Sequence, residues 1–279
     1  MGKSTLVNAL SGRHVAIVSD KPQTTRRRIL GVAHRPGAQL VLADLPGFQR
    51  PRDALTRRMQ RSVDESLEDV DAVLLVLDAS DELGPGDRFV AERVFGSGRP
   101  VVIGLNKVDL LRPYEIAPAI ARVAALGDFH ALHPISARTG DGVDALRDEL
   151  FGLLPEGPAF FQAGQDSDQP LVLRLAELVR ERALARTRDE VPHALAVTVE
   201  ELQPPTGSRA GRVVATLAVE TASQQRILVG KGGSMIRAIG ADARGEIEDL
   251  VGGRVFLDLR VKVRPRWRRD EEQLDRLGL

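Results

Sequence analysis

The sequence contains no cysteine among its 279 residues. This excludes a disulfide framework, a thiolate nucleophile and cysteine-ligated zinc or iron–sulfur sites. No apolar run approaches the ~20 residues that a membrane-spanning helix needs. The formal net charge is zero, because 39 Lys+Arg balance 39 Asp+Glu. Overall charge therefore favours neither a nucleic-acid nor a membrane partner. What is present is a 43% hydrophobic chain, long enough for two domains of ~100–200 residues each.

Lysine is scarce, since only 5 of the 39 basic residues are lysine and the other 34 are arginine. Three of these five, Lys3, Lys107 and Lys231, fall inside the motifs described below. A compact ammonium is not replaceable by a planar guanidinium where a phosphate or a base edge is approached closely. The positions of these lysines therefore favour chemistry over surface charge.

The chain opens with Gly2-Lys3-Ser4-Thr5 before an amphipathic helix. This is the second half of a phosphate-binding loop, in which a helix N-terminus, a lysine and a hydroxyl serve the β- and γ-phosphates and Mg²⁺. A simple helix cap is the alternative interpretation. The first half of the motif, a strand and a glycine five residues before Gly2, is not in this sequence; we expect it upstream of Met1, with the true start ~10–20 codons earlier.

A second motif follows the short strand predicted over Gln39–Ala43. Asp44-Leu45-Pro46-Gly47 places an acidic residue at a strand end and then a glycine-containing loop. An aspartate that binds Mg²⁺ and a glycine N–H that contacts the γ-phosphate would lie there. A plain turn is the alternative, because Pro-Gly is a common turn pair.

Apolar runs that alternate with helical segments predict a parallel sheet covered on both faces, with strands over Ala72–Leu77, Val101–Leu105 and Ala131–Ile135. Ligands of such sheets bind at the carboxyl ends of strands. Asn106-Lys107-Val108-Asp109 stands at one such end. Its aspartate can accept hydrogen bonds from N1–H and the exocyclic amine of guanine. Ser136-Ala137, at the next strand end, is placed for backbone contact with the same base.

These four elements occur in a fixed order that resembles the GTPase domain of the translation-factor-like G proteins. Within that group, Pro22-Gln23-Thr24-Thr25-Arg26 and Asp44-Leu45-Pro46-Gly47-Phe48 look like the Era family. The resemblance implies a P-loop GTPase domain of the α/β class with catalytic roles for Lys3, Thr25 and Gly47. Mg²⁺ is assigned to Ser4, Thr25 (preferred to Thr24 as the switch threonine) and Asp44. The implied nucleotide-binding residues are Gly2, Lys3, Ser4, Thr5, Thr24, Thr25, Asp44, Gly47, Asn106, Lys107, Asp109, Ser136 and Ala137.

Phe48 stands where Ras-like GTPases carry a glutamine that orients the attacking water. A phenyl ring neither donates nor accepts a hydrogen bond. The resemblance therefore implies a slow intrinsic GTPase whose water is placed by backbone groups or by a bound cation, potassium being the candidate.

The second half predicts helix, two strands, two helices and a strand, with Gly230-Lys231-Gly232-Gly233 between the two helices. This order resembles a type II KH domain of the α+β class. Glycines let backbone N–H groups approach RNA phosphates, and Lys231 adds charge. A second nucleotide loop and a plain turn are the alternatives, and the first is disfavoured because no Lys-Ser/Thr follows the last glycine.

The last strand is rich in cations, with six in Arg260–Arg269. Arg260, Lys262, Arg264 and Arg266 share one face at period two. An RNA backbone track is favoured over a solvated edge. Trp267 would either stack on a base or cover the core, and the tail after it is expected to fray. The predicted RNA-binding residues are Gly230, Lys231, Gly232, Gly233, Arg237, Arg260, Lys262 and Arg264.

The predicted division is a GTPase domain over 1–155, a linker over 156–170, a KH domain over 171–270 and a tail over 271–279. This is the Era arrangement. The resemblance implies a cytoplasmic monomer, with peripheral association to the inner face of the cell membrane. It uses GTP/GDP and Mg²⁺, binds the 3′ end of 16S rRNA and assists maturation of the 30S subunit. The alternative is an RNA-binding KH module whose nucleotide domain does not function, because the first half of the phosphate loop is missing.

Overall fold

The computed structural model describes residues 1–48 and 50–279. These residues form two compact units, which are treated separately below. The first unit contains Met1–Ala16, Arg27–Phe48 and Gln60–Asp168. The second contains Ile17–Arg26, Gln49–Met59 (described over 50–59) and Gln169–Leu279.

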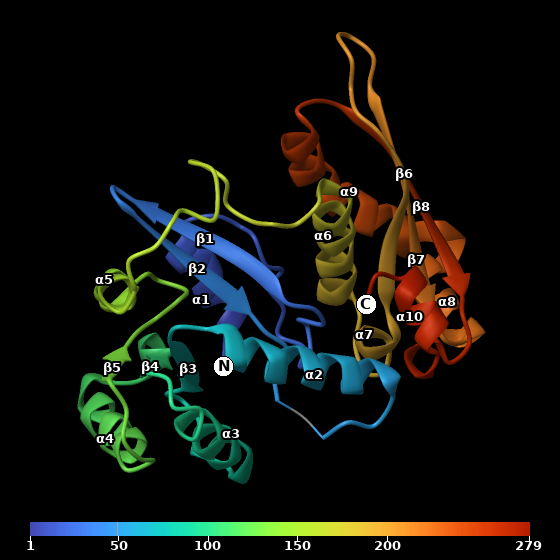
Figure 1. Ribbon diagram of the computed structural model, residues 1–279. Helices are drawn as coiled ribbons and strands as arrows, with labels where there is room; N and C mark the ends of the chain where they lie inside the picture. Colours follow the sequence, from blue (N-terminus) through green and yellow to red (C-terminus); the bar gives the residue numbers. More distant parts are fainter. Residues whose placement is uncertain (49) are drawn as a thin grey trace. The chain divides into compact units, whose positions relative to one another are not determined.

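The first unit is built from two small sheets and the helices around them (Figure 1). Strands β1 and β2 pair antiparallel, whereas β3, β4 and β5 pair parallel in that order. The elements are α1 (Lys3–Ser11), β1 (Ile29–Arg35), β2 (Ala38–Asp44), α2 (Ala54–Asp69, its first residues in the second unit), β3 (Val73–Asp78), α3 (Pro85–Phe95), β4 (Val101–Asn106), η1 (Val108–Leu110), α4 (Pro113–Ala124), β5 (Ala131–Pro134) and α5 (Val143–Gly152).

The parallel sheet is buried on both faces, as its continuous apolar strands predict. Val76 and Val102 belong to one core cluster with α1 and α5, whereas Leu75 and Ile103 belong to another with α3 and α4. Successive side chains of a strand point to opposite faces, so each strand supplies both cores. This packing holds the carboxyl ends of β3 and β4 in fixed positions.

The apolar segment over residues 14–18 does not form a strand. Residues 14–18 are irregular, because the side chain of Asn8 forms hydrogen bonds with the backbone there. The Oδ1 atom of Asn8 accepts hydrogen bonds from the backbone N–H groups of Val15 and Ala16, at 3.0 and 2.9 Å. Its Nδ2 donates to the Ala16 carbonyl at 2.7 Å. These bonds take the donors and acceptors that a strand would give to a neighbour.

The segment predicted as a linker is attached to the first unit up to Asp168. Ser167 forms an antiparallel bridge with Gly31, and the backbone N–H of Val32 donates to Asp166 at 2.9 Å. Backbone hydrogen bonds of this kind cover the free edge of β1. The contacts thus divide the chain after Asp168, whereas the sequence placed the end of the GTPase domain at Pro155.

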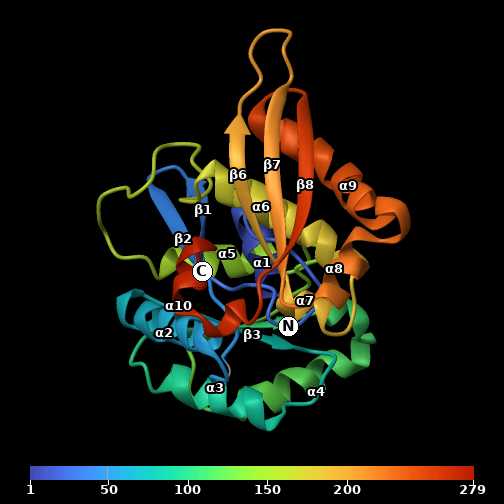
Figure 2. The same cartoon turned by 90° about the vertical axis from the view of Figure 1, so that its right-hand side faces the viewer.

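The second unit has the helix and strand order of a type II KH domain. The elements are α6 (Leu171–Arg186), α7 (Val191–Ala194), β6 (Ala196–Gln203), β7 (Gly211–Val219), α8 (Ala222–Val229), η2 (Lys231–Gly233), α9 (Ser234–Val251), β8 (Val255–Val263), η3 (Trp267–Arg269) and α10 (Glu271–Arg276). Strand β7 lies between β6, which is antiparallel to it, and β8, which is parallel. Helices α6 and α9 cover one face of this sheet (Figure 2).

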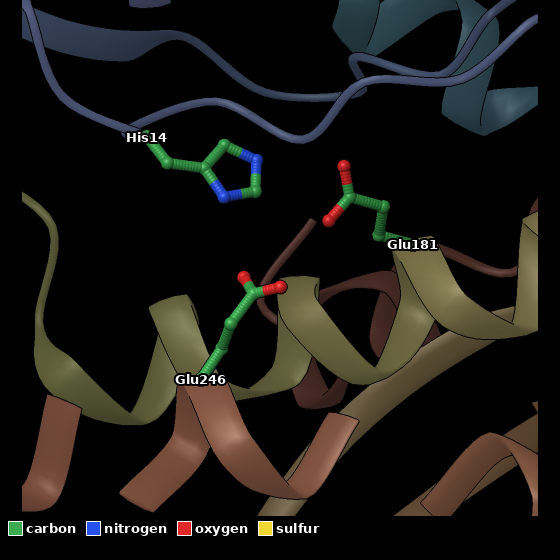
Figure 3. A group of neighbouring side chains, drawn as sticks. All are labelled: His14, Glu181 and Glu246. Atoms are coloured by element: carbon green, nitrogen blue, oxygen red, sulfur yellow. The ribbon is translucent and has the colours of Figure 1, made fainter. Parts of the chain in front are cut away.

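The packing of α6 on α9 uses charges as well as apolar contacts. Figure 3 shows Glu181 on α6 and Glu246 on α9; His14, also labelled there, belongs to the first unit. The guanidinium of Arg182 ion-pairs with Glu246 and lies 3.7 Å from a carboxylate oxygen of Glu181. This arginine lies beside carboxylates from both helices, so we assign them a structural role.

The prediction of a frayed tail is wrong, because residues 271–276 form helix α10. Leu274 is fully buried and Leu277 is 2% exposed, in one cluster with Trp267 and with Leu55 at the start of α2. The Asp270 side chain caps the helix by accepting from the N–H of Gln273 at 3.2 Å. The leucines of this helix hold it in place by packing into that cluster.

Gly245 provides a test of the packing around α9. A Cβ at this helical position would meet no atom within 4 Å, and its φ lies outside the left-handed region. Because glycine inside a helix costs ~0.5–1 kcal/mol relative to alanine, Gly245→Ala is expected to raise the free energy of unfolding by that amount. Urea unfolding measures this. Gly230→Ala, at φ +72° with a Cβ 2.7 Å from the Met235 nitrogen, should change stability in the opposite direction.

Within the described residues, no helix combines the length and the apolar character needed to cross a membrane.

Candidate functional site

The first predicted phosphate contacts lie at the N-terminus of α1. Gly2 adopts φ +84° just before the helix, and a Cβ there would lie 2.7 Å from Nδ2 of Asn106. Only glycine fits this backbone and this close approach without strain. Thr5 lies in the first turn of α1, so its N–H belongs to the group of helix N–H donors that no helical carbonyl accepts from.

Lys3, Ser4, Asp44 and Gly47 come together around this helix start. Ser4 Oγ donates to Asp44 Oδ2 at 2.6 Å, and Asp44 is 1% exposed at the end of β2. A Cβ on Gly47 would lie 3.7 Å from Nζ of Lys3, so the ammonium is beside the loop after β2. Burial lowers the pKa of Lys3, and the charge of Asp44 partly restores it. A half-buried ammonium at this helix start is suited to an anionic phosphate.

The donor set fits a magnesium ion. Mg²⁺ prefers hard oxygen ligands and usually keeps several waters while taking one or two protein oxygens and substrate phosphates. The hydroxyl of Ser4 and the carboxylate of Asp44 are such ligands, held within 2.6 Å of each other beside a cationic phosphate contact. When bound, the ion would neutralise charge on the β- and γ-phosphates.

The predicted guanine contacts gather at the carboxyl ends of β4 and β5. Asn106, 3% exposed, accepts the N–H of Ala137 at 2.9 Å and donates to the Met1 carbonyl at 2.8 Å. It thereby ties the base end of the site to the residue before Gly2. Asp109 Oδ1 accepts from the Ser136 hydroxyl at 2.6 Å, and Oδ2 lies 2.6 Å from Arg138. These two bonds, that of Ser136 first, lower the pKa of Asp109, so its carboxylate stays an acceptor in mildly acidic solution.

Lys107 has an unusual backbone and a partner that sequence reasoning missed. Its φ is +69°, in the left-handed region that non-glycine residues rarely adopt. Its ammonium ion-pairs with Asp78, at the end of β3. Burial tends to raise the pKa of Asp78, but the hydrogen bonds from Lys107 and Ser80 bring it below its usual value. Asp78 could have been predicted from its position at the carboxyl end of an apolar strand next to β4.

Thr24 and Thr25, the candidate switch residues, belong to the second unit. Thr24 Oγ1 donates to the Lys21 carbonyl at 2.7 Å, and the Thr24 carbonyl accepts from Arg180 on α6 at 2.6 Å. Thr25 is 8% exposed. The structure therefore brings the predicted phosphate and base contacts of the first unit together and places Thr24 against helix α6. The role of Thr25 toward Mg²⁺ stays a prediction.

The glycine loop of the second unit joins α8 to α9 through three left-handed or glycine-specific conformations. Gly230, Gly232 and Gly233 have φ of +72°, +59° and +79°. Lys231 is exposed within the loop, and a Cβ on Gly233 would lie 3.4 Å from the Arg237 guanidinium. The loop therefore offers backbone and two cations on one small surface, which suits a phosphate chain.

The predicted cationic face of β8 is shorter than expected and partly neutralised. The strand ends at Val263, and Arg266 has φ +56° in the turn that follows, so Arg264 and Arg266 do not continue the row. Of the two that remain, Arg260 lies 2.7 Å from Asp258 and Lys262 3.0 Å from Glu200. Their contribution to RNA binding stays a prediction, and the ion pairs reduce the charge they can offer.

Trp267 does not stack on a base, because it has no exposed surface. Its indole Nε1 donates to the Ala194 carbonyl at 2.9 Å, and its ring packs with Ala196, Ala218 and the start of α2. Of the two predicted roles, only that in covering the core agrees with the structure.

Two family models match the chain. One, described as 50S ribosome-binding GTPase, covers residues 1–107, and a KH domain model covers residues 190–268. The protein is thus a GTPase that consists of a P-loop GTPase domain followed by a KH domain. GTPase Era of Mycobacterium bovis is 44% identical over 286 residues, covering 99% of this chain and 94% of that protein. GTPase Era of a Nocardioides species is 44% identical over 291 residues, with 99% and 92% covered. The chain belongs to the Era GTPase family.

Solved Era structures share the fold over nearly the whole chain. Era in complex with MgGDPNP and nucleotides 1506–1542 of 16S ribosomal RNA superposes with a TM-score of 0.95 at 36% identity, covering 99% of this chain and 94% of that one. An Aquifex aeolicus Era variant bound to GDP and AlF4⁻ gives a TM-score of 0.94 at 35% identity, with the same coverage.

Proposed function

We propose that this protein binds the 3′ region of 16S rRNA through its KH domain, under the control of GTP and Mg²⁺ bound in its GTPase domain. In this role it assists assembly of the 30S ribosomal subunit. The observation that carries the proposal is the presence, in one chain, of a guanine-type contact set and a glycine loop with exposed backbone and two exposed cations. The Era relative that binds both MgGDPNP and a 16S rRNA fragment supports it.

The nucleotide would be held from its two ends. Asp109 accepts the two N–H donors of guanine, while Asn106 fixes Ala137 for backbone contact with the base. At the phosphate end, Lys3 and the N–H groups of α1 stabilise the negative charge that spreads over the transferred group. Ser4, Asp44 and Thr25 would hold Mg²⁺.

Hydrolysis is proposed to be slow without an added group that orients water. The ring of Phe48 lies 5.8 Å from the Arg93 guanidinium and supplies no hydrogen bond to a water molecule. The N–H of Gly47 and a bound potassium ion are the proposed means of placing the water.

Two titrations of the full chain test the function. Fluorescent GDP and GTP analogues should bind with Mg²⁺ and be displaced by GTP but not ATP. A labelled RNA with the 3′ sequence of 16S rRNA should bind more tightly than a scrambled RNA of the same composition. RNA binding without nucleotide binding would instead support the KH module with a non-functional nucleotide domain, and failure of both would contradict the proposal.

Lys231→Ala tests the glycine loop as the phosphate contact. Removing one phosphate-contacting cation should weaken RNA binding similarly for all sequences and reduce the slope of log K against log[salt] by ~0.7–1. Lys262→Ala is the matched control, because Lys262 lies in the same unit but is paired with Glu200 at 3.0 Å. An effect of Lys262→Ala on the salt slope without an effect of Lys231→Ala would place the RNA on β8 instead of the loop.

The cytoplasmic location, the peripheral association with the inner face of the membrane and the monomeric state remain proposals that rest on the family resemblance.

A further inference from the structure

The chain crosses from the first unit to the second and back at or beside the segments predicted to be its nucleotide switches. Ile17–Arg26 belongs to the second unit, although Ala16 before it and Arg27 after it belong to the first. Residues 50–59, which follow the Asp44–Phe48 motif, likewise belong to the second unit. Each segment is thus a short excursion from the GTPase domain into the RNA-binding unit.

Arg26 anchors the first of these segments. Its guanidinium donates to the carbonyl of Leu195 at 2.5 Å and to those of Pro192 and His193 at 3.0 Å. It also lies 5.5 Å from the ring centre of Trp267. Arg26 is only 8% exposed, and burial, with the nearby charge of Arg180, lowers its pKa to about 9. The group is therefore charged at neutral pH and is held in a site built around it.

Helix α6 holds the same segment at two further points. Arg180, itself paired with Glu177, donates to the carbonyl of Thr24 at 2.6 Å, and the N–H of Val18 donates to Glu181 at 2.8 Å. The side chain of Ile17 lies in the apolar core under the KH sheet. The segment is thus fixed to the rest of the second unit at both of its ends.

Few residues separate Arg26 from the candidate ligands of the nucleotide site. Thr25 is adjacent to Arg26, and neighbouring Cα atoms are only ~3.8 Å apart. On the other side, Arg27 and Arg28 alone separate Arg26 from Ile29, whose backbone pairs with Asp44, a candidate Mg²⁺ ligand. Movement of either candidate ligand therefore reaches Arg26 through a short stretch of backbone, directly from Thr25 or through Ile29, Arg28 and Arg27 from Asp44.

We propose that Arg26 is a positioning residue that couples nucleotide state to RNA binding: its anchor stays intact, and the KH unit follows the switch segment. Loss of the Arg26 contacts is the less favourable response. It would leave three carbonyls without their donor and the space beside Trp267 without the guanidinium that fills it. This coupling rests on the proposed function, whereas the anchor itself does not.

The anchor is tested first in the protein without ligands, by amide hydrogen exchange. Arg26→Gln should speed exchange in residues 17–26 by ~10-fold or more while leaving α9 and β8 protected. Arg28→Gln is the matched control, because Arg28 is an exposed arginine two residues away. Arg26→Lys, which keeps the cation but lacks the planar fork, provides a folded variant if Arg26→Gln unfolds. Unchanged exchange in both Arg26 variants would overturn the anchor.

The coupling is tested by RNA affinity in the GDP and GTP-analogue states. The wild-type ratio should be at least ~5-fold, the lower end of common coupling factors. Arg26→Lys should bring the ratio within about twofold of one while keeping the GDP-state affinity, and Arg28→Gln should keep the ratio. A preserved ratio in Arg26→Lys, or a wild-type ratio of one with both ligands bound, would overturn the coupling. A wild-type chain that fails to bind nucleotide or RNA contradicts the proposed function and the coupling, but not the anchor.

Trp267 fluorescence distinguishes movement of the KH unit with an intact Arg26 anchor from loss of the Arg26 contacts, because Trp267 is the only tryptophan in the sequence. An intact anchor keeps its surroundings constant, so its emission maximum should be the same with GDP and with a GTP analogue. A red shift on exchange to the GTP analogue would show that Arg26 leaves the ring and would overturn the proposed movement of the KH unit with the switch.

Discussion

Asp109→Asn is expected to change the preferred base from guanine to xanthine. In the proposed site the carboxylate would accept from both N1–H and the exocyclic amine of guanine, whereas an amide turns one of these acceptors into a donor. Guanine then faces a donor with its own donor, and xanthine, which has a carbonyl in place of the amine, becomes complementary. Sites built on hydrogen bonds reject a base with the wrong pattern strongly, so GDP affinity should fall at least ~100-fold.

Competition between GDP and XDP for a fluorescent nucleotide measures this change. Asp141→Asn is the matched control, because Asp141 carries the same charge in the loop after Ser136 but bonds Thr139 at 2.7 Å. It should leave the ratio of the two affinities unchanged. If Asp109→Asn weakened both nucleotides equally, Asp109 would be stabilising its loop through Ser136 and would not be reading the base.

Much of the nucleotide site could be predicted because its residues stand at strand ends. Asn106 ends β4 and Ser136 follows β5, which are neighbouring parallel strands whose carboxyl ends meet at one edge of the sheet. Asp44 ends the apolar strand β2 of the antiparallel pair. Asp78 occupies the same kind of position and was missed, because no motif marks it. On the RNA-binding side, the pairing of Asp258 with Arg260 was also predictable, since Asp258 lies two residues earlier on the same face of β8.

Contacts between residues far apart in the sequence could not be predicted from local patterns. Arg26 reads as a polar loop residue, yet it is buried because carbonyls of residues 192–195 converge on it. The carboxyl-terminal helix is similar, because Leu274 is buried by tertiary packing. Neither the period of a strand nor the composition of a loop contains information about such partners, and tertiary context overrides local preference.

Trp267→Ala is expected to lower the free energy of unfolding of the second unit by ~3–5 kcal/mol, the usual cost of removing a large buried aromatic side chain. The ring is fully buried among Ala196, Ala218, Leu274 and the first residues of α2. Alanine would leave a cavity that these small neighbours cannot fill. The Ala194 carbonyl would also lose its donor, and the Arg26 guanidinium would lose the ring beside it.

Phe256→Ala is the control, because it removes another aromatic ring with an arginine beside it. Arg212 lies 5.8 Å from the centre of the Phe256 ring, much as Arg26 lies 5.5 Å from that of Trp267, but Phe256 is 61% exposed. A surface change of this kind usually alters stability by less than ~0.5 kcal/mol. Urea unfolding followed by far-ultraviolet circular dichroism measures both variants, since Trp267→Ala removes the only tryptophan. A loss below ~1 kcal/mol for Trp267→Ala would show that the cluster around it collapses onto the cavity, and that burial of this ring does not hold the start of α2 against the KH sheet.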